Sequence, residues 1–290
     1  MLELEFEAPT TLDGAFAMLS GNGVRPLAGG SDLIVQMRSG RLRPARVVDV
    51  KRIPELIGIH RDASGWTIAA ATACAAIGAH AGLRAAWPGV VEAACLIGSA
   101  QIQGRASIGG NLCNASPAAD SVPALIAAGA VAVVGSSAGR RELPVEQMLV
   151  SPGKNSLAAG ELLLAIRLPA QGVRSADAYL RLIPRTEMDI AVVGVGVNLS
   201  LDAAGVITSA RVALGAVAPT ALLVTEAAEA IVGSKLDDAA CQRLEAVART
   251  ACRPIDDKRG TAAYRTRVAG VLASRVAKIA YARALERDRL

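Results

Sequence analysis

Aromatic side chains are the scarcest class in this sequence. The 290 residues include three Tyr, two Phe and two Trp, although 52% of the chain is hydrophobic. The core must therefore be packed with aliphatic side chains. Proteins that bind single-stranded nucleic acid stack bases on aromatic rings, so the shortage argues against that class. The net charge of +5 is better explained by surface and docking charge than by nucleic-acid binding.

Metal-binding side chains are also few and scattered. The chain has two His, and its five Cys form no C-x-x-C pair. We therefore expect no zinc or iron–sulfur site on this chain, and the unpaired, odd number of thiols suits a reducing compartment. The residues concerned are His60, His80, Cys74, Cys95, Cys113, Cys241 and Cys252.

Signals for export or membrane insertion are lacking as well. The N-terminus carries Glu3 and Glu5 where a signal peptide carries positive charge. The most apolar stretch, 122–134, is too short for a membrane span and is interrupted by Pro123 and Gly129. The sequence predicts a cytoplasmic protein with no membrane span.

The pattern of strands and helices indicates two domains of α+β class. Strand and helix patterns alternate over about the first 50 residues, which predicts a small parallel α/β unit. After Gly172 three strand patterns are followed only by helices. We predict an N-terminal domain over 1–172, with subdomains of about 1–55 and 56–172, and a separate α+β domain over 173–290.

Two pairs of adjacent glycines suggest how the chain binds a ligand. Gly29-Gly30 lies within the segment Arg25–Leu33, and Gly109-Gly110 within Ser107–Asn111. Glycine permits positive φ and close approach, so successive backbone N–H groups can point at an anion. Both pairs are predicted at strand-to-helix transitions, where they would clamp a pyrophosphate. Neither matches a Walker A loop or G-x-G-x-x-G.

Other candidate residues have two interpretations each. Asp120 and Asp32 are either helix caps or contacts to a cofactor. Cys113 is either reactive or a packing residue. A basic cluster is either a solvated face or a docking site for an acidic partner: Arg253, Lys258, Arg259, Arg265 and Arg267. Since no paired carboxylates or nucleophile–base set occurs, a bound cofactor must supply any chemistry.

Several of these segments together resemble the FAD-binding medium subunit of molybdenum hydroxylases, the family of carbon monoxide dehydrogenase and xanthine dehydrogenase. The resemblance covers nearly the whole chain. It rests on the motifs Leu27–Leu33, Ser107–Asn111, Ala115–Pro117 with Asp120, Arg185–Ala191 and Asp257–Arg265.

The resemblance implies a fold and a set of cofactor-binding residues. The fold is a two-subdomain FAD-binding domain of the p-cresol methylhydroxylase type, followed by a small domain with a three-stranded antiparallel sheet and a helix bundle. Backbone N–H groups of the two glycine motifs would hold the FAD pyrophosphate, Asp120 would bond a cofactor hydroxyl, and Tyr179 is a candidate flavin neighbour. The implied cofactor-binding residues are Arg25, Pro26, Leu27, Ala28, Gly29, Gly30, Ser31, Asp32, Leu33, Ile97, Ser107, Ile108, Gly109, Gly110, Asn111, Asp120, Leu163 and Arg181.

The resemblance also implies an oxidoreductase that works with partners. Electrons would pass from [2Fe–2S] clusters on a small iron–sulfur subunit through FAD to an external acceptor. Molybdopterin would lie on a large subunit, and the complex would be a dimer of heterotrimers. No side chain of this chain would be catalytic. The alternatives are a stand-alone FAD-dependent oxidoreductase acting on a small substrate and a non-redox nucleotide-binding assembly protein.

Overall fold

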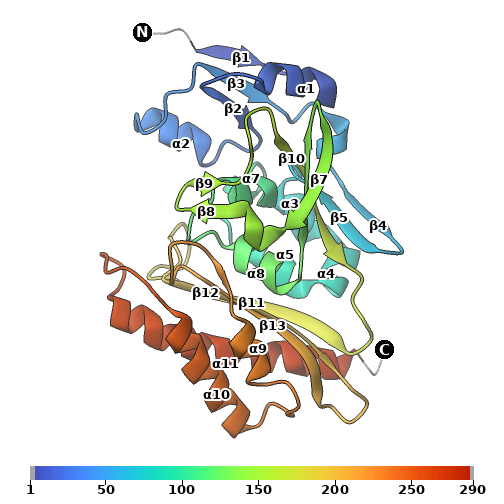
Figure 1. Ribbon diagram of the computed structural model, residues 1–290, viewed down its shortest axis with the longest axis vertical. Coiled ribbons are helices and arrows are strands. Elements are labelled where there is room, and N and C mark those ends of the chain that lie inside the picture. The colour runs from blue at the N-terminus through green and yellow to red at the C-terminus, as the bar shows by residue number, and fades with distance from the viewer. Residues whose placement is uncertain (1–3, 288–290) are drawn as a thin grey trace.

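The computed structural model describes residues 4–287, and its three parts are stacked along the long axis of the molecule (Figure 1). The N-terminal part is a three-stranded parallel sheet in the order β1-β3-β2, which confirms the predicted parallel α/β unit. Helix α1 begins after Thr11, whose Oγ1 accepts the Gly14 N–H at 3.2 Å. The elements are β1 (Glu5–Glu7), α1 (Leu12–Leu19), β2 (Val24–Leu27), α2 (Leu33–Arg38) and β3 (Arg46–Asp49). The alternating pattern of Leu2–Phe6 predicts the first strand, and its residues 2 and 3 lie outside the described residues.

The central part is an antiparallel sheet of five strands in the order β4-β5-β10-β6-β7, packed against short helices. Apolar residues of α5 and α8 fill the core beneath the sheet. Its strands, with the separate hairpin β8–β9, are β4 (Ile59–Asp62), β5 (Gly65–Ala69), β6 (Val131–Ser136), β7 (Gly139–Pro144), β8 (Leu149–Ser151), β9 (Lys154–Asn155) and β10 (Leu162–Pro169). Its helices are α3 (Cys74–Ala79), α4 (Ala81–Ala86), α5 (Pro88–Cys95), α6 (Ala100–Gln103), α7 (Ile108–Cys113) and α8 (Ser121–Ala127), with 3₁₀ turns η1 (Pro54–Leu56) and η2 (Val145–Met148).

The C-terminal part is a second antiparallel sheet, β11-β12-β13-β14, covered by helices. Three long strands agree with the expected sheet, and the two-residue β14 adds a fourth strand that was not predicted. Small residues let α10 and α11 pack closely. Alanines of both helices lie in the core, and a Cβ on Gly270 of α11 would lie 2.8 Å from the Glu245 carbonyl oxygen of α10. The elements are β11 (Ser175–Leu182), β12 (Val193–Leu201), β13 (Ile207–Gly215), β14 (Leu222–Leu223), α9 (Thr225–Glu229), α10 (Asp238–Ala251) and α11 (Ala262–Glu286).

A buried carboxylate joins the central and C-terminal parts. Asp177 of β11 accepts the Val90 N–H at the start of α5, with an N···O distance of 2.9 Å. A Cβ on Gly89 would lie 2.6 Å from the same carboxylate oxygen, so a side chain at position 89 would push the strand away. Arg283 of α11 donates to the Asp177 carbonyl at 3.0 Å and forms an ion pair with Glu92 of α5. The C-terminal sheet therefore caps a helix of the central part.

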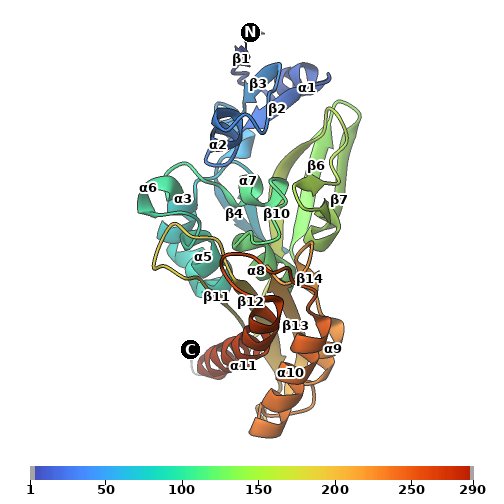
Figure 2. The same cartoon turned by 90° about the vertical axis from the view of Figure 1, so that its left-hand side faces the viewer.

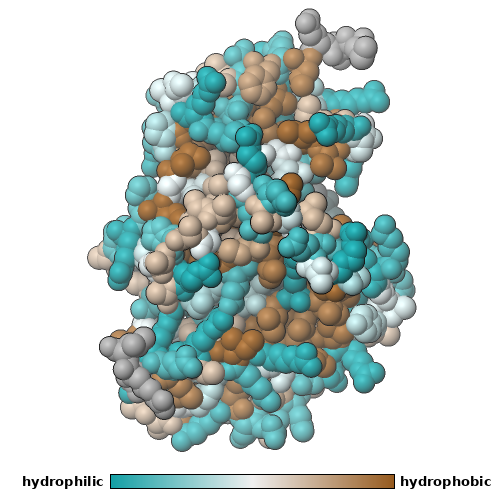
Figure 3. Space-filling model, turned by 180° about the vertical axis from the view of Figure 1, so that it is seen from behind, coloured by the Kyte–Doolittle hydropathy of each residue, from teal (hydrophilic) through white to brown (hydrophobic). Residues whose placement is uncertain are grey.

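The surface mixes polar and apolar side chains. Seen from behind, hydrophobic residues form patches that hydrophilic ones separate from one another (Figure 3). Of the helices within residues 4–287, none combines the length and apolarity that a membrane span needs.

Candidate functional site

The first glycine turn connects β2 to α2 and packs directly on another segment of backbone. Gly30 has a φ of +77°, in the left-handed region that favours glycine. A Cβ on Gly29 would lie 2.0 Å from the Arg105 carbonyl oxygen, a distance that no side chain can accept. The first turn therefore touches the segment that leads into the second pair of glycines.

The backbone of this first turn has free hydrogen-bond donors. Ile34 donates its N–H to the Gly30 carbonyl at 3.0 Å, which starts the helix. Within the described chain, the five N–H groups from Gly29 to Leu33 donate to no protein acceptor. Successive free amides ahead of a helix attract negative charge. This turn has the donors that a phosphate group requires.

The second glycine pair differs from its predicted setting. It follows the short helix α6 instead of a strand, and both glycines lie in the first turn of α7. Ser107 causes this: its Oγ accepts the Gly110 N–H at 3.0 Å and its carbonyl accepts the Asn111 N–H at 3.0 Å. A Cβ on Gly109 would lie 2.3 Å from the Ala70 carbonyl oxygen. Here the first glycine serves close packing, and the Gly110 amide is already engaged.

Both glycine motifs line one cavity of about 590 Å³. Its walls come from three stretches far apart in sequence, 19–33, 97–114 and 153–163, as well as a few residues between them. Hydrogen bonds tie these walls together. Gln36 donates to the Asn114 side-chain oxygen at 2.8 Å, and Asn155 donates to the Cys113 carbonyl at 2.7 Å.

The structure brings together all but three of the predicted site residues. Ile108, Asp120 and Arg181 do not line the cavity, and Ile108 is fully buried in the core. Ile97 and Leu163, which lie far apart in sequence, both line it. The predicted residues in the wall are Arg25, Pro26, Leu27, Ala28, Gly29, Gly30, Ser31, Asp32, Leu33, Ile97, Ser107, Gly109, Gly110, Asn111 and Leu163.

Sequence reasoning missed most of the third wall, the segment 153–161. The β8–β9 hairpin carries Gly153, Lys154 and Asn155 into the cavity, and the chain then runs along it to Glu161. Gly153 has a φ of +75° and donates to the Ala115 carbonyl at 2.9 Å. The Pro-Gly turn at 152–153 was the only local signal, and a turn alone does not indicate which cavity it faces.

A buried polar cluster lies between α8 and β11. Arg181 Nη1 is 2.6 Å from Asp120 Oδ2, and the Tyr179 hydroxyl donates to Asp120 Oδ1 at 3.2 Å. Burial raises the pKa of Asp120 to about 6, although Arg181 and Tyr179 favour its charged form. Asp120 stands at the N-cap position of α8, yet its side chain makes no capping hydrogen bond. The capping interpretation of Asp120 is therefore wrong, since its carboxylate holds Arg181 and Tyr179.

The cysteine in the cavity wall has an unreactive thiol. Cys113 lines the cavity, and burial raises the pKa of its thiol to about 12. The thiolate is the reactive form, so the packing interpretation fits this residue. Within residues 4–287, His, Cys, Asp and Glu side chains nowhere gather in threes as a metal site would require.

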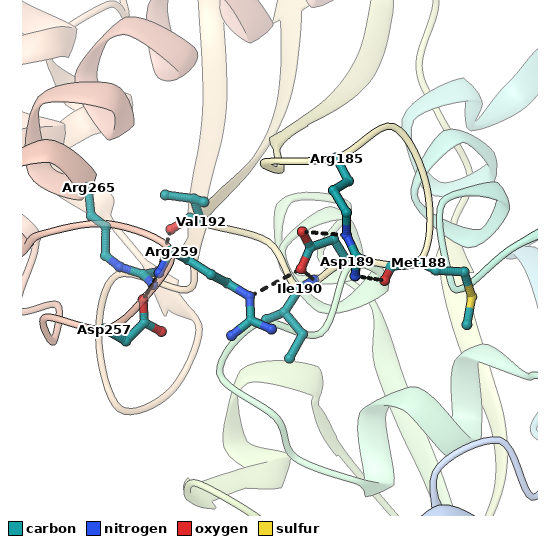
Figure 4. A network of polar contacts seen from close by, with 8 residues as sticks. All are labelled: Arg185, Met188, Asp189, Ile190, Val192, Asp257, Arg259 and Arg265. Atoms are coloured by element: carbon teal, nitrogen blue, oxygen red, sulfur yellow. Dashed lines mark hydrogen bonds and ion pairs between the residues drawn. The ribbon is translucent and has the colours of Figure 1, made fainter.

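Two of the five residues in the basic cluster at the start of α11 form ion pairs within the chain. Arg265 is buried, 2.7 Å from Asp257 and donating to the Val192 carbonyl at 2.8 Å. Arg259 Nε is 3.2 Å from Asp189, which also pairs with Arg185 (Figure 4). The interpretation as a solvated face is wrong for Arg265, whose side chain is 4% exposed. The interpretation of the cluster as a docking site stays a prediction. These ion pairs bring the motifs 185–191 and 257–265 side by side.

The fold and the cavity define a class: a mixed helix-and-sheet protein in which two glycine motifs line one cavity, with a C-terminal α+β part. Comparison with known families agrees. Residues 2–171 match the FAD binding domain in molybdopterin dehydrogenase, and residues 178–280 match the CO dehydrogenase flavoprotein C-terminal domain. The chain belongs to this family of FAD-containing dehydrogenase subunits.

Individual relatives extend over almost the whole chain. It is 34% identical to the carbon monoxide dehydrogenase medium chain of Afipia carboxidovorans, over 97% of each chain. It is 31% identical to the nicotinate dehydrogenase FAD-subunit of Eubacterium barkeri, over 81% of this chain and 82% of the relative. The solved carbon monoxide dehydrogenase from Hydrogenophaga pseudoflava superposes with a TM-score of 0.93 at 32% identity, over 97% and 98% of the two chains. The protein is thus an oxidoreductase subunit whose cofactor is FAD.

Proposed function

We propose that this chain is the flavin subunit of a three-component, cytoplasmic molybdenum hydroxylase. It takes electrons from [2Fe–2S] clusters on a small partner subunit and delivers them from FAD to an external acceptor. A large subunit carries molybdopterin and the substrate pocket, and the complex is a dimer of heterotrimers. The observation that carries the proposal is one cavity lined by both glycine motifs, in a chain similar to medium chains over nearly its full length.

The residues of the cavity fit the parts of FAD. The free N–H groups from Gly29 to Leu33 supply donors for the pyrophosphate, and the helix that follows adds a favourable dipole. Ser107, Asn111 and the buried backbone around Gly109 form the opposite wall. Arg25 and Lys154 line the cavity as cations. Bound FAD supplies the redox chemistry, and the chain binds, orients and desolvates it.

The Asp120 cluster stands just outside this wall in the proposed arrangement. Asp120 was predicted to bond a cofactor hydroxyl and Arg181 to line the cofactor, and both remain predictions. The side chains of Arg181 and Asp120 are 5% and 11% exposed and pair with each other at 2.6 Å. Such a pair keeps its geometry because neither partner can move alone without leaving a charge uncompensated.

The test is native purification of the full chain with whatever remains bound to it. We expect a flavin spectrum, release of FAD on denaturation, and two further chains, one of which shows iron–sulfur absorption. A chain that turns over a substrate alone would support the stand-alone oxidoreductase. Bound flavin that cannot be photoreduced and reoxidised by an artificial acceptor would support the non-redox assembly protein. A chain that binds no FAD would refute the proposal.

A further inference from the structure

Helix α2 has two faces with different surroundings. Leu33 and Gln36 line the cofactor cavity. Ile34 and Val35 are 42% and 62% exposed, and the helix contains no buried residue. In both ribbon views α2 lies at the edge of the molecule with no element of the described chain over its outer side (Figures 1 and 2). Val35 is the more exposed of the two, whereas the Ile34 side chain also lies over Gly30, where a Cβ would be 2.8 Å from Ile34 Cδ1.

Three arginines without acidic partners lie at the end of α2 and in the segment that follows it. Between Asp32 and Asp49 the sequence has no Asp or Glu. The chain after α2 folds back on the helix, since Leu42 donates its N–H to the Gln36 carbonyl at 3.1 Å. Within residues 4–287, Arg38, Arg41 and Arg43 form no ion pair. We call Ile34, Val35, Arg38, Arg41 and Arg43 the α2 patch.

The α2 patch is distinguished by three unpaired arginines within six residues of sequence, since several arginines elsewhere are paired with acids. Arg185 and Arg259 share Asp189, and Arg46 near the patch is held by Glu5 at 2.5 Å. Those cations are neutralised within the chain and offer little attraction to a partner. The α2 patch keeps its positive field, so it favours an acidic surface with an apolar centre.

We propose that the α2 patch is the docking surface for the electron-donor chain, which presents acidic side chains around an apolar contact. The inference rests on the proposed function. Electron transfer weakens steeply with distance, so a donor must dock beside the flavin cavity. Helix α2 satisfies this condition because it forms the cavity wall with one face and the patch with the other.

Two other classes of partner fit the patch less well. A membrane-surface helix needs a longer amphipathic segment than the six residues of α2. Single-stranded nucleic acid needs aromatic rings for stacking, and Ile34 and Val35 supply none. A protein partner uses both features of the patch, the apolar centre and the charged rim.

The test compares charge reversal at the patch with a matched reversal elsewhere. The variant R38E/R41E/R43E is made in the full chain and assembled with its partner subunits. We expect unchanged FAD content and an unchanged unfolding temperature, but a Kd for the iron–sulfur chain raised roughly tenfold or more. Val35→Asp should weaken the same contact by a smaller factor. Wild-type association should slow as KCl rises, since salt screens the charges.

The matched control is R140E/K235E/R275E, which makes the same change in net charge at exposed basic residues that form no ion pair within residues 4–287. It should leave the Kd within twofold of wild type, taken as about the error of such a measurement. A patch variant that binds the iron–sulfur chain with wild-type Kd would overturn the docking inference alone. The inference would also be overturned if the variant lost only its binding to phosphatidylglycerol vesicles. A wild-type chain with neither FAD nor an iron–sulfur partner would refute the proposed function, and the inference with it.

Discussion

Gly29 and Gly109 lie where two segments of backbone approach so closely that a methyl group has no room. A Cβ would sit 2.0 Å from the Arg105 carbonyl oxygen in one case and 2.3 Å from the Ala70 carbonyl oxygen in the other. Backbone cannot yield as a flexible side chain does. The width of the cavity is therefore set by the absence of two side chains, and each glycine pair has one member devoted to packing.

We predict that Gly29→Ala and Gly109→Ala each destabilise the protein by about 1–3 kcal/mol through overpacking, and that both reduce FAD occupancy. Chemical unfolding and the flavin-to-protein absorbance ratio measure the two effects. Gly21→Ala is the control, since it also lines the cavity but its Cβ would meet only Val24 at an ordinary 3.5 Å. Equal flavin content in all three variants would show that the close contacts do not shape the site.

At the scale of elements, α5 links the domain interface to the cavity. Its N-terminus is capped by Asp177 of the C-terminal sheet, and Ile97, just beyond its C-terminus, lines the cavity. The pKa of Asp177 is raised to about 7, mainly by burial and to a smaller extent by the negative charge of Glu92. The Gly89 and Val90 amides and Arg283 favour the charged form and oppose this rise. The second oxygen of this carboxylate has no hydrogen-bond partner within the described residues.

Because this pKa is raised on folding, the stability of the folded protein depends on pH. The folded-state pKa of about 7 lies above the ordinary 3.8, so the folded protein binds this proton more tightly than the unfolded chain. The stabilisation that Asp177 contributes is fully present below about pH 4 and is lost as the pH rises through about 7. Asp177→Asn keeps an oxygen for the Val90 N–H and should flatten this part of the profile.

Urea unfolding of both proteins at pH 5 and pH 8 tests the prediction. Wild type should lose more stability between the two pH values than the variant. The control is Asp238→Asn, whose side chain is 97% exposed and which should follow the wild-type profile. Parallel profiles for wild type and Asp177→Asn would contradict the assigned role.

The elements that the sequence predicted are those with a clear apolar pattern. The apolar runs Trp66–Ala70, Val131–Val134 and Glu161–Leu168 predict three strands. They correspond to β5, β6 and β10 inside the central sheet. The two edge strands, β4 and β7, were missed because Ile59–Asp62 and Gly139–Pro144 are dominated by polar residues. Polar edge strands are common because they discourage pairing with other chains. Their place in the sheet follows from their neighbours and not from local pattern.

The site was predictable where its chemistry is local. The glycine motifs imply a close backbone approach, and both line the cavity. The secondary structure around these motifs was less predictable. Ser107 begins α7 two residues before Gly109, and its Oγ accepts the Gly110 N–H. The pairing of Arg259 with Asp189, 70 residues away, is set by tertiary folding. No short-range signal carries that information.

At the scale of the whole molecule, the cavity lies between separate hydrophobic cores. One core surrounds Phe16 and Val48 in the N-terminal part, and another fills the central part around Leu125 and Ile126. A ligand that contacts both walls binds the folded state and not the unfolded chain. FAD should therefore act as a non-covalent crosslink between the two parts.

We predict that removing FAD lowers the unfolding temperature and that adding it back restores stability by about 2.7 kcal/mol at a free concentration a hundred times Kd. FMN, which lacks the adenosine half, should restore less at the same concentration because it leaves part of the cavity unfilled. Thermal unfolding against ligand concentration measures both. Gly29→Ala is the control and should respond weakly to FAD. Equal stabilisation by FMN would contradict a site built for the whole dinucleotide.

The order in which the cavity walls are made constrains when the cofactor can enter. Gly29 is synthesised early, whereas Leu163 belongs to β10, the middle strand of the central sheet. At about 5–20 residues per second, a ribosome releases β10 many seconds after the first glycine turn. A nascent chain halted before β10 emerges should carry no flavin, so cofactor loading belongs to late or completed synthesis.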